Sequence, residues 1–291
     1  MHQNKATILI TSFNEPETIG RAIEHAQKQK TSYDYDILIS APDSETLAIA
    51  EGYALLDDRI KLFKDEGKGK SFAINSLLPK ITSDILILTD GDVYISDNAV
   101  ESIMKAFENP EIGCVSGKVV PTNDPTKKMG YFAHTLALGA DLERQRRDKK
   151  GLFSEVSGYL FGYRSILINS FPQDCAEDAI ISMIIDDLDW RIGYVPTAEV
   201  YVKYPTNLED FVKQKVRTAK SHENLTKYFP NANKMKSFSN ELIRGLPMVI
   251  GKSLREIGWT IQLMFLRLII WVKARKGNQY KDGWEVISSS K

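Results

Sequence analysis

The sequence has few of the residues that build metal clusters or disulfide frameworks. Its 291 residues include two cysteines and four histidines. Cys114 and Cys175 lie far apart without the spacing of a metal site, so neither a disulfide scaffold nor a zinc-binding domain is expected. Lysine plus arginine and aspartate plus glutamate both number 38, so no overall field attracts nucleic acid, and we expect no nucleic-acid partner.

Long hydrophobic runs are also missing. The longest uncharged run of the most apolar segment, residues 257–266, has ten residues, whereas a membrane span needs roughly 18–20. The N-terminal residues reach a strand-like segment at once and lack the apolar core of a signal peptide. Hydrophobic residues make up 43% and charged residues 26%, as in ordinary folded domains. We therefore expect a cytoplasmic protein with one large domain or two small ones.

The first 120 residues alternate between strand-like and helix-like segments. Apolar runs that each precede a segment with helical periodicity occur at residues 6–10, 35–40, 60–63 and 84–89, and a further strand-like run follows at 113–120. Strands that are apolar throughout are typical of a parallel sheet covered by helices on both faces. The sequence therefore predicts an α/β fold with a mostly parallel central sheet. Ligands of such sheets bind beyond the carboxyl ends of the strands.

The pattern beyond Pro121 is less regular. We expect two strands around a turn at Pro196, and helices at residues 129–147, 177–188 and 207–229. We divide the chain into an α/β domain, residues 1–232, and a carboxyl-terminal amphipathic helical region, residues 233–291.

Two carboxylates separated by one glycine follow the run at 84–89. Residues i and i+2 of an extended backbone project to the same side, so Asp90 and Asp92 can converge on one ligand, and Gly91 permits close approach. Two hard oxygen ligands suit Mg²⁺ or Mn²⁺, which completes its shell with phosphates and water. A solvated turn after the strand explains the same three residues equally well.

Three other predicted strand ends carry groups that suit a nucleotide. The segment 11–15 supplies hydroxyl, amide and carboxylate groups, and Asp43 could accept a hydrogen bond from a nucleobase or ribose. Lys68, Gly69 and Lys70 open a helix, and a helix N-terminus with two ammonium groups favours a diphosphate. An ordinary polar loop accounts for each segment alone. However, all four follow successive parallel strands, so they are expected at one edge of the sheet.

In their order and spacing these motifs resemble those of inverting family 2 glycosyltransferases with the GT-A fold. The resemblance continues in "VSGYLFGYRS" (156–165), "CAEDAIIS" (175–182) and "QKVR" (214–217), and it covers roughly residues 6 to 220. It implies that residues 1–232 are a GT-A catalytic domain with a nucleotide-sugar half and an acceptor half, at about residues 1–120 and 121–232. It also implies a nucleotide-sugar donor, most simply a UDP-sugar, and a metal held by Asp90 and Asp92.

The resemblance also assigns roles to single residues. Asp178 would be the catalytic base, and Glu177 would orient it or contact the acceptor, although adjacent acids at a helix start can also serve only the helix dipole. Gly158 and Tyr159 would line the acceptor side. The residues expected to bind the nucleotide sugar are Thr11, Ser12, Asn14, Glu15, Asp43, Lys68, Lys70, Asp90, Gly91, Gln214 and Arg217.

The last motif departs from the family pattern. Thr218 stands where processive synthases usually have tryptophan, which weakens the expectation of polymer synthesis. His222 could bind a metal or a phosphate, but a lone surface histidine is the simpler interpretation. The resemblance implies transfer of a hexose or N-acetylhexosamine to a hydroxyl of a glycan or lipid-linked glycan.

The segment 242–276 is expected to contact a membrane surface on its cytoplasmic face. Trp259 and Trp271, with the cations at 273, 275 and 276, bracket its apolar run as in a helix that lies in the membrane interface. A helix packed on the catalytic domain or in a dimer interface is the alternative.

The leading hypothesis is a metal-dependent inverting glycosyltransferase. A sugar-phosphate nucleotidyltransferase is one alternative, but it would require a glycine-rich loop with arginine after the first strand, and "TSFNEPET" contains neither residue. A non-catalytic nucleotide-sugar binding module at a membrane surface is the other. Such a module would be expected to have lost one of the motif acids, and all are present.

Overall fold

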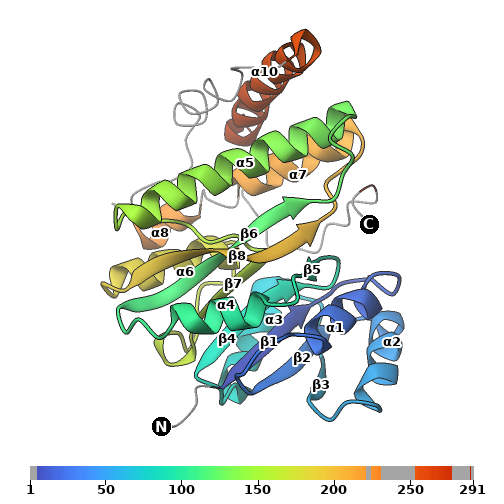
Figure 1. Cartoon of the computed structure of the whole chain (residues 1–291), viewed down its shortest axis with the longest axis vertical. Coiled ribbons are helices and arrows are strands. Elements are labelled where there is room, and N and C mark those ends of the chain that lie inside the picture. Colours follow the sequence, from blue (N-terminus) through green and yellow to red (C-terminus); the bar gives the residue numbers. More distant parts are fainter. Residues whose placement is uncertain (1–4, 221–223, 231–252, 277–288, 290–291) are drawn as a thin grey trace.

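The computed structural model describes residues 5–220, 224–230, 253–276 and 289 (Figure 1). Its strands are β1 (Ala6–Thr11), β2 (Tyr35–Ala41), β3 (Ile60–Lys64), β4 (Ile85–Asp90), β5 (Tyr94–Ile95), β6 (Ile112–Pro121), β7 (Leu160–Arg164) and β8 (Arg191–Val202). Its helices are α1 (Ile19–Gln27), α2 (Ser44–Ala54), α3 (Lys70–Leu77), α4 (Ala99–Ala106), α5 (Lys128–Lys149), α6 (Glu177–Asp187), α7 (Leu208–Lys220), α8 (Leu225–Tyr228) and α10 (Leu254–Lys276).

The strands form one sheet in the order β3-β2-β1-β4-β7-β6-β8-β5. The first four strands are parallel to one another, as the sequence predicts, because each is a short apolar run buried between helices. Thr11 at the end of β1 pairs with Ser40 of β2 and with Asp90 of β4. The carboxyl ends of these strands therefore lie level at one edge.

An antiparallel strand joins the two halves of the sheet. β7 lies between β4 and β6 and runs opposite to both, so the sheet is mixed although most of its strand pairs are parallel. Because β7 runs antiparallel, its first residue, Leu160, pairs with Thr89 near the carboxyl end of β4. The segment that precedes β7 is thereby brought to the same edge as Asp90.

The prediction of two strands around Pro196 is wrong. Residues 191–202 form a single strand, β8, that is parallel to β6. The pairing passes from Gly117–Val195 to Lys118–Glu199, so residues 196–198 are extra residues on the β8 side. A bulge of this kind accommodates a proline that cannot donate a backbone hydrogen bond, and the strand continues through it.

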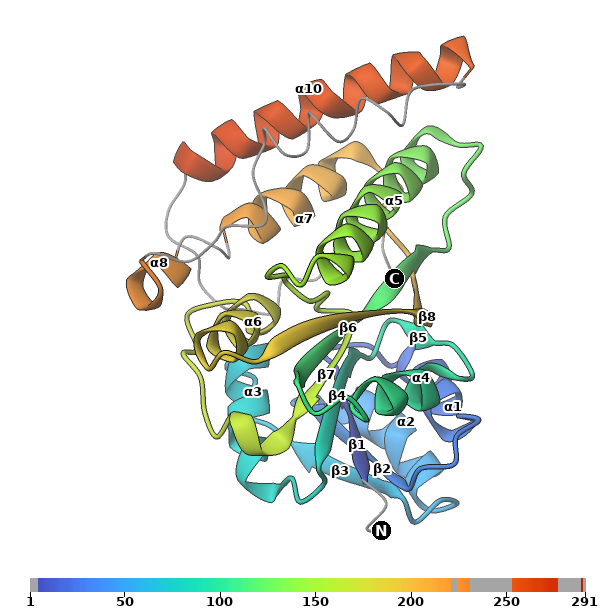
Figure 2. The same ribbon diagram turned by 60° about the vertical axis from the view of Figure 1, so that its left-hand side comes forward.

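Helices cover both faces of the sheet (Figure 2). Buried residues of α1, α2 and α4 form a core with one face, and those of α3 and α6 form a second core with the other. The predicted helices at 129–147 and 177–188 are confirmed as α5 and α6. The single helix predicted at 207–229 is wrong, because α7 ends at Lys220 and α8 is separate.

The helix α10 packs on α5 and α7, above the sheet in Figure 2. Leu263 and Ile270 of α10 are buried against Phe132 and Phe211. Trp259 lies 5.6 Å from Tyr131 between ring centroids. Both expected interface tryptophans are partly buried, and the Trp271 indole nitrogen is fully buried, so they are not exposed anchors.

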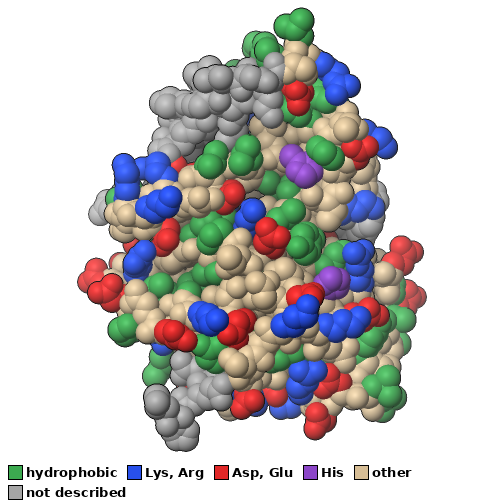
Figure 3. Space-filling model, viewed as in Figure 1, with side chains coloured by type: hydrophobic (Ala, Val, Ile, Leu, Met, Phe, Trp, Pro, Cys, Tyr) green, Lys and Arg blue, Asp and Glu red, His purple; other side chains and the backbone are tan. Residues whose placement is uncertain are grey.

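The opposite face of α10 exposes an apolar stripe. Ile261, Phe265, Leu268 and Val272 follow helical spacing, and 43–64% of each residue is exposed. Hydrophobic side chains reach the surface over α10 in Figure 3. An 18-residue window within Leu254–Ala274 has a mean hydropathy of 1.4, so this helix could cross a membrane by length and composition, in contrast to the expectation that the segment is too short. Core helices of soluble proteins can meet the same criterion. The segment 242–252 lies outside the described residues.

Candidate active site at the carboxyl edge of the sheet

A buried lysine forms the centre of the site. Lys70 Nζ lies 2.6 Å from Asp90 Oδ1 and 2.6 Å from Glu177 Oε1. It also donates a 3.4 Å hydrogen bond to the carbonyl oxygen of Gly158. The three charged side chains are between 10% and 22% exposed. Three sequence-predicted site residues, Asp90, Gly158 and Glu177, therefore meet around the ammonium group of a fourth, and the four come from four different segments of the chain.

Asp65 holds the loop that precedes Lys70 in place. This buried carboxylate accepts hydrogen bonds of 2.8 Å from the Gly67 amide and from the Ser40 hydroxyl at the end of β2. Gly67 and Gly69 have φ angles of +66° and +112°, which glycine adopts readily. The sequence interpretation missed Asp65. Its position directly after β3 and two residues before a glycine was the available signal.

The two acids at the start of α6 are fastened to α3. Ser71 Oγ donates to the carbonyl oxygen of Cys175, and the Asn75 side chain forms two hydrogen bonds with the backbone of Phe171. These contacts hold the chain just before Glu177 and Asp178 against α3. Neither Ser71 nor Asn75 was predicted, because their partners lie about 100 residues away in the sequence.

The segment before β7 lies against the same acids. Thr89 Oγ1 donates a 2.9 Å hydrogen bond to the carbonyl oxygen of Tyr159. A Cβ atom added to Gly158 would lie 3.2 Å from Asp178 Oδ2 and 3.5 Å from Glu177 Oε1. The predicted acceptor-side segment therefore borders Asp178, and glycine keeps this approach open.

Burial and charge shift the pKa values at this centre. Burial raises the pKa of Glu177, and the Lys70 ammonium opposes that shift. Burial disfavours the charged form of Lys70, but Asp90 and Glu177 outweigh it and raise the Lys70 pKa. Lys70 is therefore charged and is shared by two acids. Burial also raises the pKa of Tyr159, which is further affected by the charges of Asp90, Asp92 and Arg217.

The segment 11–15 and Asp43 converge beside this centre. Asp43 accepts 2.8 Å hydrogen bonds from the backbone amides of Asn14 and Thr46, and the Thr46 contact caps α2. Ser12 Oγ donates to Glu15 Oε2 at 2.7 Å. The predicted strand-end loops are thus in contact. A direct role of Asp43 toward a nucleoside stays a prediction, because both its carboxylate oxygens already accept backbone hydrogen bonds.

Gly91 permits the closest approach in the site. Its amide donates a 2.9 Å hydrogen bond to the carbonyl oxygen of Thr11. A Cβ atom at this position would lie 2.7 Å from Ser12 Cβ and 2.8 Å from Glu15 Oε2. The chain can join the two loops in this way only with glycine between Asp90 and Asp92.

The remaining predicted residues differ in their placement. Lys68 is exposed and pairs with Glu66 at 2.6 Å, away from the Lys70 centre. Gln214 on α7 is buried, and its Oε1 has no hydrogen-bond partner among the residues that the structure describes. Arg217, one turn further along α7, contributes charge at Tyr159. His222 lies outside the described residues.

Asp90 and Asp92 suit a hard divalent cation whose coordination shell is completed by a diphosphate. Asp90 accepts hydrogen bonds from Lys70 and Thr11 through Oδ1, and within the described ranges no contact is seen at Oδ2. In those ranges no group of three or more histidine, cysteine or acidic residues could hold a metal by itself. Mg²⁺ and Mn²⁺ sites that use substrate phosphates need only one or two carboxylates, which Asp90 and Asp92 can supply.

Solved structures share the fold. A mannosyltransferase of Pyrobaculum calidifontis, in complex with GDP-Man and Mn²⁺, is 15% identical and has a TM-score of 0.68. The alignment covers 95% of this chain and 88% of that one. TarS of S. aureus is 14% identical, with a TM-score of 0.51 over 94% of this chain and 55% of that one. These likenesses confirm the predicted GT-A type of fold.

Sequence comparisons identify the family. A poly-β-1,6-N-acetyl-D-glucosamine synthase of Staphylococcus aureus is 25% identical over 80% of this chain and 58% of its own length. An N-acetylglucosaminyltransferase of Rhizobium meliloti is 22% identical over 74% and 54%. The chain thus spans less than three fifths of the length of these curated relatives. The family model for glycosyl transferase family 2 matches residues 7–171, and the chain belongs to this family.

Proposed function

We propose that this protein is a divalent-metal-dependent, inverting glycosyltransferase that uses a nucleotide sugar. The observation that carries the proposal is the buried meeting of Lys70, Asp90 and Glu177, with Asp178 adjacent, in a chain whose residues 7–171 match the family 2 model. The strand-end loops put nucleotide-binding groups and candidate metal ligands beside an acid that can act as a base. A single site with these groups can perform an in-line displacement.

The donor binds along the edge of β1, β2 and β4. Segment 11–15 and Asp43 hold the nucleoside, and the N-terminus of α3 with Lys70 and Arg217 holds the diphosphate. Asp90 and Asp92 hold Mg²⁺ or Mn²⁺, which when bound neutralises charge on the departing diphosphate. The Mn²⁺ and GDP-Man of the solved mannosyltransferase support this assignment, although its nucleotide differs from the UDP that we favour.

Asp178 accepts the proton of the acceptor hydroxyl. As that proton moves to the carboxylate, the hydroxyl oxygen forms a bond to the anomeric carbon, and the bond from that carbon to the diphosphate oxygen breaks. One displacement inverts the anomeric centre and releases a nucleoside diphosphate. Gly158 leaves space for the acceptor beside Asp178, and the ion pair with Lys70 fixes Glu177 next to the base.

The acceptor is a hydroxyl of a glycan or lipid-linked glycan, and the transferred unit is a hexose or N-acetylhexosamine. The names of the Staphylococcus and Rhizobium relatives support N-acetylglucosamine as the first sugar to test. Thr218 lacks the aromatic ring expected of a processive synthase, and its hydroxyl donates to the Gln214 carbonyl instead. This difference favours a limited number of transfers.

We also propose that the protein contacts a membrane peripherally from the cytoplasmic side, through α10. The support is the apolar stripe of Ile261, Phe265, Leu268 and Val272, with exposed Lys273 nearby. Such a contact would keep a lipid-linked acceptor close to the active site.

Nucleotide release tests the reaction class. Purified protein is mixed with UDP-GlcNAc, other UDP-sugars and GDP-mannose, with Mn²⁺ and acceptor extracts, in the presence or absence of a chelator. A glycosyltransferase releases nucleoside diphosphate in a metal-stimulated manner. Formation of sugar phosphate in the presence of pyrophosphate would indicate a nucleotidyltransferase, and binding of donors without any turnover would indicate a binding module.

A further inference from the structure

Lys70 supplies one positive charge to two acids that belong to different parts of the proposed site. Asp90 ends β4 on the donor side, whereas Glu177 begins α6 on the acceptor side. The ammonium contacts both at 2.6 Å and is largely shielded from water. It therefore occupies the immediate surroundings of Asp90 Oδ1, where a divalent cation would also be attracted.

The two partners of Lys70 differ in how they are tied to it. Ser71 and Asn75, on the same helix as Lys70, hydrogen-bond the segment 171–175 just before Glu177. Lys70 and Glu177 thus belong to one hydrogen-bonded unit. Asp90 belongs to the central sheet and contacts this unit through its ion pair with Lys70. The contact between Lys70 and Asp90 is consequently the one that can open while the rest of the unit stays in place.

A divalent cation at Asp90 and the ammonium of Lys70 repel each other at this range. A diphosphate relieves this repulsion, because the Lys70 ammonium can leave Asp90 and pair with the negatively charged oxygens of the diphosphate. A cation that arrives alone meets an opposing charge, whereas a cation that arrives with a diphosphate does not.

We propose that Lys70 is a positioning residue and internal counter-ion that disfavours divalent cation binding at Asp90 until a nucleoside diphosphate binds with it. The inference rests on the proposed function and adds the order in which its ligands assemble. Cation and nucleotide then bind cooperatively, and each raises the affinity of the other by the same factor. The device also compensates part of the negative charge of Asp90 and Glu177 while no donor is present.

Mn²⁺ titration of the full chain, followed by the electron paramagnetic resonance signal of free Mn²⁺, tests this coupling without any turnover. In the wild type we expect UDP to tighten Mn²⁺ binding by roughly tenfold or more. Lys70→Met removes the charge but keeps the aliphatic stem. This variant should bind Mn²⁺ alone about tenfold more tightly than the wild type, and UDP should add less than about threefold.

Three further variants complete the experiment. Lys80→Met removes an exposed charge close to the other end of α3 and should match the wild type, whereas Asp90→Asn should lose Mn²⁺ with and without UDP. If Lys70→Met does not fold, the double variant Lys70→Met/Glu177→Gln can be compared with Glu177→Gln, because it leaves one acid fewer without a counter-ion. The double variant should then bind Mn²⁺ alone more tightly than Glu177→Gln does.

The outcomes separate this inference from the proposed function. If UDP tightens Mn²⁺ binding to the wild type but the Lys70 variants bind Mn²⁺ alone no more tightly, the counter-ion role is wrong and the enzyme assignment stands. If neither UDP nor GDP affects Mn²⁺ binding and no nucleotide sugar is turned over by the wild type, the proposed function itself is wrong.

Discussion

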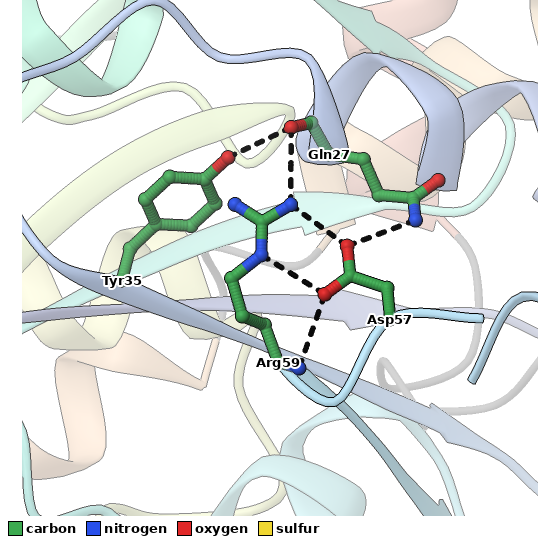
Figure 4. A network of polar contacts seen from close by, with 4 residues as sticks. All are labelled: Gln27, Tyr35, Asp57 and Arg59. Atoms are coloured by element: carbon green, nitrogen blue, oxygen red, sulfur yellow. Dashed lines mark hydrogen bonds and ion pairs between the residues drawn. The ribbon is translucent and has the colours of Figure 1, made fainter. Parts of the chain in front are cut away.

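Two charged clusters lie at opposite ends of the parallel strands and differ in the geometry of their ion pairs. At the amino end of β3, Arg59 grips Asp57 through Nε and Nη2 at 3.0 and 2.7 Å, and Gln27 and Tyr35 complete the network (Figure 4). At the carboxyl ends, Lys70 joins acids that follow it by 20 and 107 residues.

The chemistry of the two clusters follows from this difference. In the Arg59 cluster, both carboxylate oxygens of Asp57 accept hydrogen bonds from one planar guanidinium. A ligand that replaced Asp57 at either nitrogen would break this two-point contact. In the Lys70 cluster, one flexible ammonium serves two acids and can exchange one of them for a phosphate. A fork between two residues that lie two positions apart stabilises the fold, whereas one ammonium shared between acids of β4 and α6 is suited to bind and release a ligand.

The largest effect is expected at the proposed base. Asp178→Asn keeps the size of the side chain but cannot accept the acceptor proton, so transfer should fall by about 10²- to 10⁴-fold. Donor binding, measured by calorimetry with a UDP-sugar and Mn²⁺, should persist. Transfer at the wild-type rate by this variant would show that another group is the base.

Removal of the metal is expected to cause the second-largest loss of turnover. Chelation or Asp90→Asn should lower turnover on the order of 10²-fold, because the leaving diphosphate loses charge neutralisation worth several kcal/mol. Added Mn²⁺ should restore the chelated wild type but not the variant. Turnover that is unaffected by chelation would contradict a metal-dependent reaction.

The Arg59 cluster should affect stability and leave chemistry intact. Asp57→Asn leaves the Arg59 fork with a weaker acceptor and should cost about 1–2 kcal/mol of unfolding free energy, while turnover per folded molecule is unchanged. Urea denaturation and initial-rate measurements on the same samples check both statements. A large loss of turnover without loss of stability would remove the distinction between the two clusters.

The pH dependence of this stability difference has a defined sign. The hydrogen bonds from Arg59 lower the pKa of Asp57 below its ordinary value of 3.8. A carboxyl group with a lowered folded-state pKa contributes stability above that ordinary value and loses it as the pH falls toward the lowered one. The difference in unfolding midpoint between wild type and Asp57→Asn should therefore be constant near neutral pH and shrink below about pH 4.

The smallest effect is expected at the surface of α10. Phe265→Glu places a charge in the exposed apolar stripe and should reduce co-sedimentation with anionic liposomes several-fold, while turnover with a water-soluble acceptor is retained. Leu56→Glu, at a leucine after α2 that is 87% exposed against 64% for Phe265, serves as the control. Equal sedimentation of wild type and both variants would rule out the membrane contact.

Local patterns in the sequence were sufficient to predict the donor edge. Each of the first four strands is a short apolar run, so its end and the polar residues that follow could be read directly, including Asp43 and Asp90. The position of β7 could not be read in this way. β7 is an antiparallel strand that lies next to the four parallel ones, and the local periodicity of a strand does not indicate with which strands it pairs.

The partners of Lys70 show the same limit for the site. The helix N-terminus and its two lysines predicted that Lys70 binds a diphosphate, but its ion pairs with Asp90 and Glu177 arise only when β4 and α6 are brought together. Ser71 and Asn75 were missed for the same reason, since each acts through a backbone group of another segment. Asp65 was missed although its place before a glycine was a signal in the sequence. For α10, hydropathy indicated an apolar helix, but which face is buried depends on α5 and α7.

The insertion of β7 determines how the molecule can move. Enzymes that bind two substrates between separate lobes often close by rotating one lobe about a hinge. Here β7 is hydrogen-bonded to β4 on one side and to β6 on the other, and β5 from the first half pairs with β8 from the second. Rotation at either junction would break backbone hydrogen bonds inside the core. The two halves therefore move as one body, and substrate entry depends on small shifts of side chains and loops around a rigid sheet.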